Sequence, residues 1–264
     1  MPAFAQTGAW TGPVAPTAVA PALTLTIVSL TIAYARHATL ERIAATIRGA
    51  DADVVALQEV DRFTRRQPVD QATRLGELLG MQVAYAPAIS YQGGEFGVAV
   101  LSRLPITGVA VHKLPVLDVQ TLPGPARLLF GCRRDDIEQR VLLIETLETA
   151  ASGVPITVAT THLGLCGDRE RLPQARGIAV HATRLDVLAG DFNARPSALA
   201  ASVAGVLEAA GLTIGAANGV DWIAAPSCNQ LVSSRTLTER VSDHRAITAT
   251  FRFACDRSRP SGAE

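Results

Sequence analysis

Short apolar runs separated by turn-forming residues recur along most of this 264-residue chain. Residues 23–34 alternate between apolar and polar and are rich in β-branched side chains, which predicts a first strand. Comparable runs predict strands over 53–58, 82–86, 97–102, 106–114, 140–148, 155–161, 187–189, 220–224, 230–233 and 244–253. The runs within residues 140–161 are expected to form a hairpin that turns at 151–153.

Helical periodicity appears between some of these runs. The helices predicted in chain order cover 39–49, 70–79, 169–181 and 197–210. Thr39 and Ser197 are the expected N-caps, while Gly80 and Gly211 are the expected stops. Strands that are spread over the whole chain and interrupted by a few helices favour two sheets packed face to face with helices outside.

Length and composition indicate one large domain with a substantial core, because 48% of the residues are hydrophobic and the mean hydropathy is +0.23. The formal net charge is zero. This balance does not favour a dedicated nucleic-acid binder, although a locally basic cleft is the alternative. The sequence contains no run of 18 apolar residues, so no membrane span is predicted.

The predicted domain covers residues 23–254, between a flexible Ala/Pro-rich leader over 1–22 and a loose tail over 255–264. The leader lacks the basic and apolar regions of a signal peptide. The four cysteines, at 132, 166, 228 and 255, form neither a C-x-x-C pair nor a zinc-like spacing. We therefore expect isolated, reduced thiols and a cytoplasmic location, with an unusual export signal as the alternative.

Four apolar runs each have a polar motif at one end: Gln58-Glu59, Thr161-His162, Gly190-Asp191-Phe192-Asn193 and Ser242-Asp243-His244. Together they supply carboxylates, an amide and two imidazoles, which are the groups that hold a hard divalent cation and activate water. Three motifs follow their strands and the fourth precedes its strand. If that last strand runs antiparallel to the others, all four motifs meet at one edge of the sheet core.

In this order the motifs resemble the endonuclease/exonuclease/phosphatase superfamily, which has the deoxyribonuclease I-like fold. The resemblance covers about 23–253 and rests on ADVVALQEVD (52–61), GGEFGVAVLSRLPI (93–106), TTHLG (160–164), LAGDFNARPS (188–197), VDWI (220–223) and SDHRAI (242–247). It implies a four-layered α/β sandwich of two packed mixed β-sheets flanked by helices. It also implies hydrolysis of phosphoester bonds that depends on Mg²⁺, with Mn²⁺ as the alternative.

The resemblance and the chemistry of the side chains together assign the roles. Glu59 is the expected Mg²⁺ ligand, and Asp243 is a further carboxylate at the metal. His244 acts on the phosphate as general base or electrostatic stabiliser. Asp221 is expected to orient His244 through a carboxylate–imidazole hydrogen bond.

The remaining motif residues are expected to contact the water and the phosphate. Asp191 positions or deprotonates the attacking water, and Asn193 binds a phosphoryl oxygen. His162 donates a hydrogen bond to another non-bridging oxygen, and Glu95 orients His162. The sequence leaves open whether His244 or Asp191 is the general base.

One departure from the family pattern lies at the end of the first strand, where relatives carry an Asn that helps to hold metal or phosphate. Thr31 occupies this position, and a hydroxyl lacks the reach and the two donors of an amide. A weakened metal site or reduced activity is therefore expected.

Three functions compete on this basis. The favoured function is a phosphodiesterase or phosphatase that acts on a small or lipid-derived phosphoester. The alternatives are a DNA or RNA endonuclease or exonuclease of the same fold, and an inactive binding module, for which Thr31 is the supporting feature. The long connection at 115–138, rich in Pro, Gly and charge, is the expected specificity element.

Overall fold

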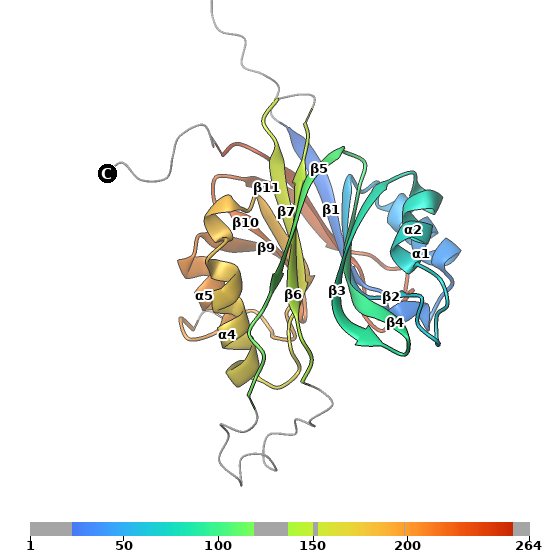
Figure 1. The fold of residues 1–264 in the computed structure, drawn as a ribbon. Coiled ribbons are helices and arrows are strands. Elements are labelled where there is room, and N and C mark those ends of the chain that lie inside the picture. The colour runs from blue at the N-terminus through green and yellow to red at the C-terminus, as the bar shows by residue number, and fades with distance from the viewer. Residues whose placement is uncertain (1–22, 119–136, 150–152, 198, 256–264) are drawn as a thin grey trace, which may run out of the picture.

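A computed structural model of the chain describes residues 23–118, 137–149, 153–197 and 199–255. These residues form two six-stranded mixed sheets packed face to face, with helices on both outer faces (Figure 1). The arrangement confirms the predicted four-layered α/β sandwich.

The first sheet carries the N-terminal half of the domain and its last two strands. Its order is β11 (Gln230–Thr236), β12 (Ile247–Arg252), β1 (Thr24–Thr31), β2 (Val54–Arg62), β4 (Gly94–Ser102) and β3 (Gln82–Tyr91). β1 and β2 are parallel, whereas β12 is antiparallel to β1. Helices α1 (Leu40–Gly49) and α2 (Gln71–Leu79) pack apolar side chains such as Ile43 and Leu75 on the outer face of this sheet.

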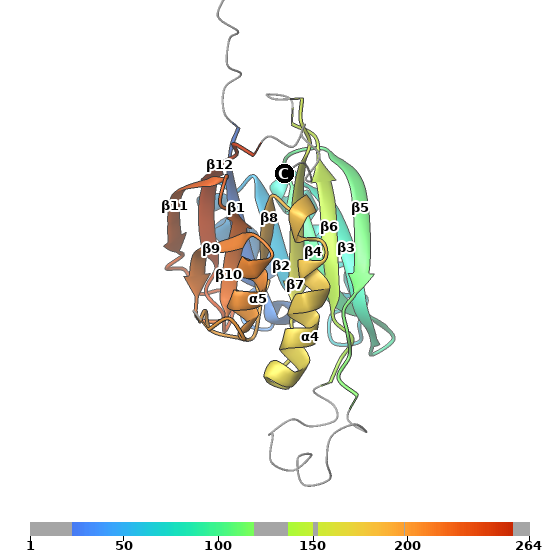
Figure 2. The same ribbon diagram turned by 90° about the vertical axis from the view of Figure 1, so that its left-hand side faces the viewer.

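The second sheet has the order β5 (Ile106–Lys113), β6 (Val141–Leu147), β7 (Ile156–His162), β8 (Val187–Asp191), β10 (Asp221–Pro226) and β9 (Leu212–Asn218). β7 and β8 are parallel, and β10 is antiparallel to β8. Helices α4 (Asp168–Ala179) and α5 (Val203–Ala209) cover its outer face, which Figure 2 turns toward the viewer. The described residues also form two short 3₁₀ turns, η1 (Ala33–Ala35) and η4 (Ala182–Arg184).

Between the sheets, the side chains that face each other are apolar along most of each strand and polar at one end of the strands. On β1, Leu25 and Ile27 belong to the inter-sheet core, and Thr31 is buried two positions after Ser29 on the same face. On β7, Val158 is in this core and His162 lies at the end of the strand. The sandwich therefore has a polar end, which is formed by the carboxyl ends of β1, β2, β7 and β8.

Side-chain capping explains where α1 and α5 begin. The Thr39 side chain accepts a hydrogen bond from Arg42 N at 3.3 Å, which confirms the predicted cap of α1. The helix predicted from Ser197 is wrong in its start. Ser202 caps α5 instead, because its Oγ accepts from Gly205 N at 3.0 Å, so the helix covers only Val203–Ala209.

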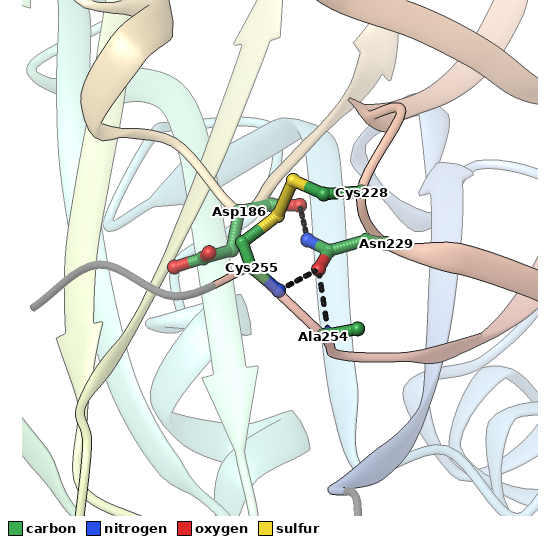
Figure 3. Close-up of a disulfide and its surroundings, with 5 residues drawn as sticks. All are labelled: Asp186, Cys228, Asn229, Ala254 and Cys255. Carbon is green, nitrogen blue, oxygen red and sulfur yellow. Dashed lines mark hydrogen bonds between the residues drawn. A yellow bond between two sulfur atoms is a disulfide. The ribbon is translucent and has the colours of Figure 1, made fainter. Parts of the chain in front are cut away.

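A disulfide joins Cys228 to Cys255 at the end of the sandwich opposite the polar end (Figure 3). Cys228 lies where the chain passes from β10 in one sheet to β11 in the other, and Cys255 follows β12. The neighbouring Asn229 donates to Asp186 O at 3.2 Å and accepts from Ala254 N at 3.2 Å. The disulfide and Asn229 thus tie the two sheets together at this end.

This disulfide corrects the expectation of isolated, reduced thiols. Cys166 is also disulfide-bonded, and no free cysteine is present among the described residues. The sequence missed the Cys228–Cys255 pair because the two residues are 27 positions apart and meet only through the topology of β10, β11 and β12. Disulfides persist mainly in oxidising compartments, so the cysteines no longer support a cytoplasmic location.

Several sequence predictions lie outside the described residues. These are the leader over 1–22, the tail from 256 onward, Cys132 and the central part of the 115–138 connection, at 119–136. Within the part of the chain that the structure describes, no helix is long and apolar enough to cross a membrane.

Candidate active site

Strand pairing brings the four motifs to the polar end of the sandwich. His162 on β7 is in register with Asp191 on β8, and Asp191 is in register with Asp221 on β10. In the other sheet, Thr31 on β1 is in register with Gln58 on β2. Because β12 runs antiparallel to β1, the residues before it, including His244, reach the same edge, as the sequence predicted.

Asp191 lies between two imidazoles. Its Oδ2 is 3.5 Å from His162 Nε2 and 3.8 Å from His244 Nδ1, and its side chain is 2% exposed. Its Oδ1 accepts a hydrogen bond from Asn193 N at 2.8 Å, which supports the left-handed backbone of Asn193 at φ 47°. The turn after β8 therefore places a buried carboxylate at the centre of the site.

The Asn193 side chain links this turn to the end of β7. Its Nδ2 donates to Leu163 O at 2.8 Å and lies 3.0 Å from His162 Nε2. Because an amide nitrogen can only donate, the contact with Asn193 assigns His162 Nε2 as the acceptor, and Asp191 Oδ2 lies near the ring without a hydrogen bond to it. Burial, with the charges of Arg140 and His244, lowers the pKa of His162 well below its usual value, so the ring is neutral.

His244 and Asp221 form the predicted pair. Asp221 Oδ2 is 2.8 Å from His244 Nδ1, which fixes the orientation of the ring. The hydrogen bond that His244 donates to Asp221 raises the pKa of His244 to about 9. Burial, followed by the charge of Asp221, raises the pKa of Asp191 to about 7.

Glu59 owes its position to a β-bulge. The pairing of β2 with β4 shifts between Leu57 and Val60, and Glu59 has a left-handed φ of 56°, a conformation uncommon for this residue type. Burial and the charge of Asp243 raise the pKa of Glu59. Its carboxylate accepts no hydrogen bond from the residues that the structure describes. The bulge thus places the Glu59 carboxylate within electrostatic reach of Asp243 and His244.

Asp243 was expected to be a metal ligand, but both of its carboxylate oxygens already accept hydrogen bonds. Its Oδ2 accepts from Arg36 Nη2 at 2.6 Å, and its Oδ1 accepts from Ser242 Oγ at 2.9 Å. The Asp243 side chain is 42% exposed. A cation at Asp243 would therefore compete with Arg36.

Thr31 makes only long contacts within the site. Its hydroxyl is 3.4 Å from Gln58 Oε1 and 3.5 Å from Asp221 Oδ1, and its single hydrogen cannot serve both. Gln58 Nε2 donates to Thr160 Oγ1 at 2.9 Å, so the amide of the Gln58-Glu59 motif joins the two sheets beneath the site.

The expected contact between Glu95 and His162 is wrong. Glu95 lies near the start of β4, opposite Arg62 on β2, and its Oε2 is 2.5 Å from Arg62 Nη2. The partners of His162 are Asn193 and Asp191 instead. The sequence could not show this, because the register of β4 against β2 decides which side chain Glu95 meets.

Two arginines near the site were missed by the sequence reasoning. Arg140, immediately before β6, is 4% exposed, and its charge lowers the pKa of both His162 and Glu59. Its Nη2 is 3.3 Å from Glu138 Oε2, and its Nε is buried without a partner among the described residues. Arg140 precedes an apolar run just as the SDH motif does, which is the signal that could have found it. Arg171 on α4 donates to the carbonyl oxygen of Asn193.

The residues present fit a hard divalent cation. Ligand atoms of Asp191, Asp221 and His244 lie within 4.8 Å of one another. His244 Nδ1 is already hydrogen-bonded to Asp221, so carboxylate oxygens are the better ligands for the cation. Glu59 and Asp191 are close enough that the charge of Glu59 raises the pKa of Asp191. Two neighbouring carboxylates with raised pKa values, one buried and one half-buried, are the arrangement that a cation would stabilise.

This fold and this collection of groups define the class of the protein. Residues 32–244 match the Endonuclease/Exonuclease/phosphatase family, and the chain belongs to that family. The match confirms the resemblance drawn from the sequence motifs. Members of the family hydrolyse phosphoester bonds and generally depend on divalent metals.

Solved structures with the same fold are distant in sequence. An endonuclease/exonuclease/phosphatase from Beutenbergia cavernae is 22% identical, with a TM-score of 0.67, and the match covers 88% of this chain and 72% of that one. The catalytic domain of human Nocturnin, with bound sulfate, is 20% identical, with a TM-score of 0.62 and coverages of 87% and 93%. A mannosyl-6-phosphatase from Bacteroides thetaiotaomicron is 15% identical, with a TM-score of 0.65 and coverages of 87% and 100%. A comparison with curated proteins gave no match.

Proposed function

We propose that this chain is a Mg²⁺- or Mn²⁺-dependent phosphodiesterase or phosphatase that acts on a small or lipid-derived phosphoester. The observation that carries the proposal is the position of the buried Asp191 carboxylate between the imidazoles of His162 and His244. A carboxylate beside a carboxylate-bound imidazole is the arrangement needed to activate water and to stabilise charge on a phosphate. The structural likeness to a phosphatase that acts on a phosphorylated sugar is consistent with a small substrate.

The charge state of each side chain indicates its role in the reaction. Asp191 accepts the proton of the attacking water, since its pKa of about 7 lies near neutral pH. His244 carries positive charge beside the phosphate, because the hydrogen bond that it donates to Asp221 raises its pKa to about 9. This division favours Asp191 over His244 as the general base.

Donors on the second sheet complete the phosphate site. The buried guanidinium of Arg140, whose Nε has no partner among the described residues, binds a non-bridging oxygen as negative charge develops on it. Asn193 binds another by exchanging its contact with His162 Nε2 for the phosphate. Glu59 would hold the divalent cation, which leaves Asp191 free to act as the base. When bound, that cation supplies Lewis-acid stabilisation of the phosphate.

The test is hydrolysis of bis(p-nitrophenyl) phosphate and of the p-nitrophenyl monoester with Mg²⁺ or Mn²⁺. We expect Asp191→Asn to lower kcat at least ~100-fold, because it removes the proton acceptor. Asp51→Asn is the matched control, since Asp51 is 87% exposed and paired with Arg103 away from the site. Equal melting temperatures would show that all three proteins are folded. Wild-type turnover by Asp191→Asn would refute the assignment.

A nucleic-acid substrate is the second candidate, because exposed arginines lie on the first sheet's side of the site. Arg36 is 46% exposed beside Asp243, and Arg65 follows β2. Plasmid DNA and RNA therefore belong in the same assay. Cleavage of either, with a binding affinity that falls steeply with salt, would favour a nuclease over an enzyme for small substrates.

A further inference from the structure

Helix α4 buries polar side chains that contact no catalytic group directly. Glu170 is 1% exposed and Gln174 is fully buried, although the helix also buries Ala175 and Ile178. Burying a polar group is costly unless it is hydrogen-bonded. The partners of these two side chains therefore indicate what the helix face does.

Both partners are backbone amides of the loop that follows His162. Gln174 Oε1 accepts from Gly164 N at 2.8 Å, and Glu170 Oε2 accepts from Cys166 N at 2.8 Å. A Cβ on Gly164 would lie 1.9 Å from the Glu170 carboxyl carbon, so any other residue here would displace the Glu170 carboxylate. The loop that ends β7 is thus fixed on α4.

Arg171, on the same turn of α4, holds the second loop of the site. Its Nη1 donates to the carbonyl oxygen of Asn193, and its Nη2 donates to Asp168 Oδ1 at 3.1 Å. The Arg171 side chain is only 17% exposed. The Asn193 carbonyl belongs to the left-handed turn whose amide binds Asp191.

The two loops are also joined to each other, because Asn193 Nδ2 donates to Leu163 O at 2.8 Å. One face of α4 therefore holds a unit that contains His162, Asp191 and Asn193. A displacement of about 1 Å of such groups can reduce turnover about 100-fold. An arginine and a glutamine outside the reacting groups could thus control the rate.

We propose that Arg171 and Gln174 are positioning residues, which hold the His162 loop and the Asp191–Asn193 turn in their catalytic geometry. The inference rests on the proposed phosphoester hydrolysis for its kinetic consequence, but the geometry it describes can be measured without substrate. It assigns α4 a role beyond covering the sheet.

The experiment compares Arg171→Met and Gln174→Met with Arg176→Met, all in non-reducing buffer. Arg176 lies on the exposed side of the same helix, so its change to Met is the matched control. We expect kcat to fall about 10- to 100-fold in the first two variants while KM changes less than about threefold, because geometry and not binding is lost. Arg171→Lys should restore part of kcat, since an ammonium can still donate to the Asn193 carbonyl.

A second measurement separates this inference from the proposed function. The ¹⁵N chemical shifts of the His162 ring report its contacts with Asn193 and Asp191 directly. We expect them to change in Arg171→Met and to stay at wild-type values in Arg176→Met. Unchanged shifts and unchanged kcat in folded Arg171→Met and Gln174→Met would overturn the positioning role. If the wild type hydrolyses no phosphoester but the shifts change as expected, the proposed function fails and the positioning role stands.

Discussion

Asp191 and His244 show how the protein changes the chemistry of single residues. Burial raises the pKa of Asp191 to about 7, and the hydrogen bond that His244 donates to Asp221 raises the pKa of His244 to about 9. The sequence predicted these residues and the Asp221–His244 contact, because each belongs to a motif at a strand end. It could not predict their proton affinities, since those depend on depth of burial and on neighbours from other strands.

Thr31 is the residue at which the sequence resemblance predicts an Asn, and a change there tests that expectation. Thr31→Asn adds a second donor where the hydroxyl makes only contacts of 3.4 and 3.5 Å. One additional hydrogen bond of about 1 kcal/mol corresponds to about a fivefold effect. We therefore expect kcat to rise, or the half-activating Mg²⁺ concentration to fall, by about that factor.

Thr31→Val is the control for this change, since it keeps the shape and removes the hydroxyl. Steady-state kinetics at several Mg²⁺ concentrations measure both quantities. If Thr31→Asn behaves like the wild type in both, the amide of the relatives is not needed in this chain.

At the scale of elements, the sequence predicted the helices and strands that have strong local signals and missed features that depend on strand pairing. Thr39 caps α1 as predicted, because the cap and the apolar periodicity agree. The sequence did not predict β9 (Leu212–Asn218), because Gly215 and Asn218 are residue types that are uncommon in strands. The segment forms a strand by pairing with β10. The bulge that aims Glu59 was likewise unpredictable, since it arises from the register between β2 and β4.

Strand β6 carries a buried carboxyl group that no motif explains. Glu145 lies between Leu143 and Leu147 on the inter-sheet face, is fully buried, and has no hydrogen-bond partner for either oxygen among the described residues. Burial raises its pKa from 4.5 to about 9. The folded protein therefore keeps this proton at neutral pH, whereas the unfolded chain releases it.

This difference makes stability depend on pH in a defined direction. The stabilising contribution is fully present below about pH 4.5 and is lost as pH rises toward 9, by about 1.4 kcal/mol per unit. Glu145→Gln removes this loss and should raise the free energy of unfolding by about 3 kcal/mol at pH 7. Urea denaturation at pH 5 and pH 8 measures this change in the free energy of unfolding. Glu148→Gln is the control, because Glu148 is exposed. An equal effect of Glu145→Gln at both pH values would contradict the account.

At the scale of the whole molecule, topology explains both what was predicted and what was missed. Four motifs far apart in sequence meet because β1, β2, β7 and β8 end at the same edge and β10 and β12 begin there. The expectation that β12 is antiparallel was sufficient to predict this meeting. The disulfide at the opposite end was missed, because its spacing of 27 residues carries no recognisable signal.

The disulfide should stabilise the fold without affecting the chemistry. The double variant Cys228→Ser/Cys255→Ser opens a loop of 27 residues, so we expect the free energy of unfolding to fall by about 3 kcal/mol. The kcat should remain at the wild-type value, since the polar end lies at the other edge of both sheets. Denaturation and turnover measured in parallel test both points. Wild-type stability, or a loss of kcat in the folded variant, would show that this assignment is wrong.

The central claim is that the polar end of the sandwich hydrolyses phosphoesters with a cation held by Glu59. The most direct test is the dependence of phosphoester turnover on Mg²⁺ after treatment with EDTA, for the wild type, Glu59→Gln and Glu208→Gln. Glu208 lies exposed on α5 and provides the matched control. We predict no turnover in EDTA, recovery with Mg²⁺, and a half-activating concentration at least ~10-fold higher in Glu59→Gln alone, because the cation loses a carboxylate ligand. Turnover that persists in EDTA, or an unchanged Mg²⁺ dependence in Glu59→Gln, would contradict the claim.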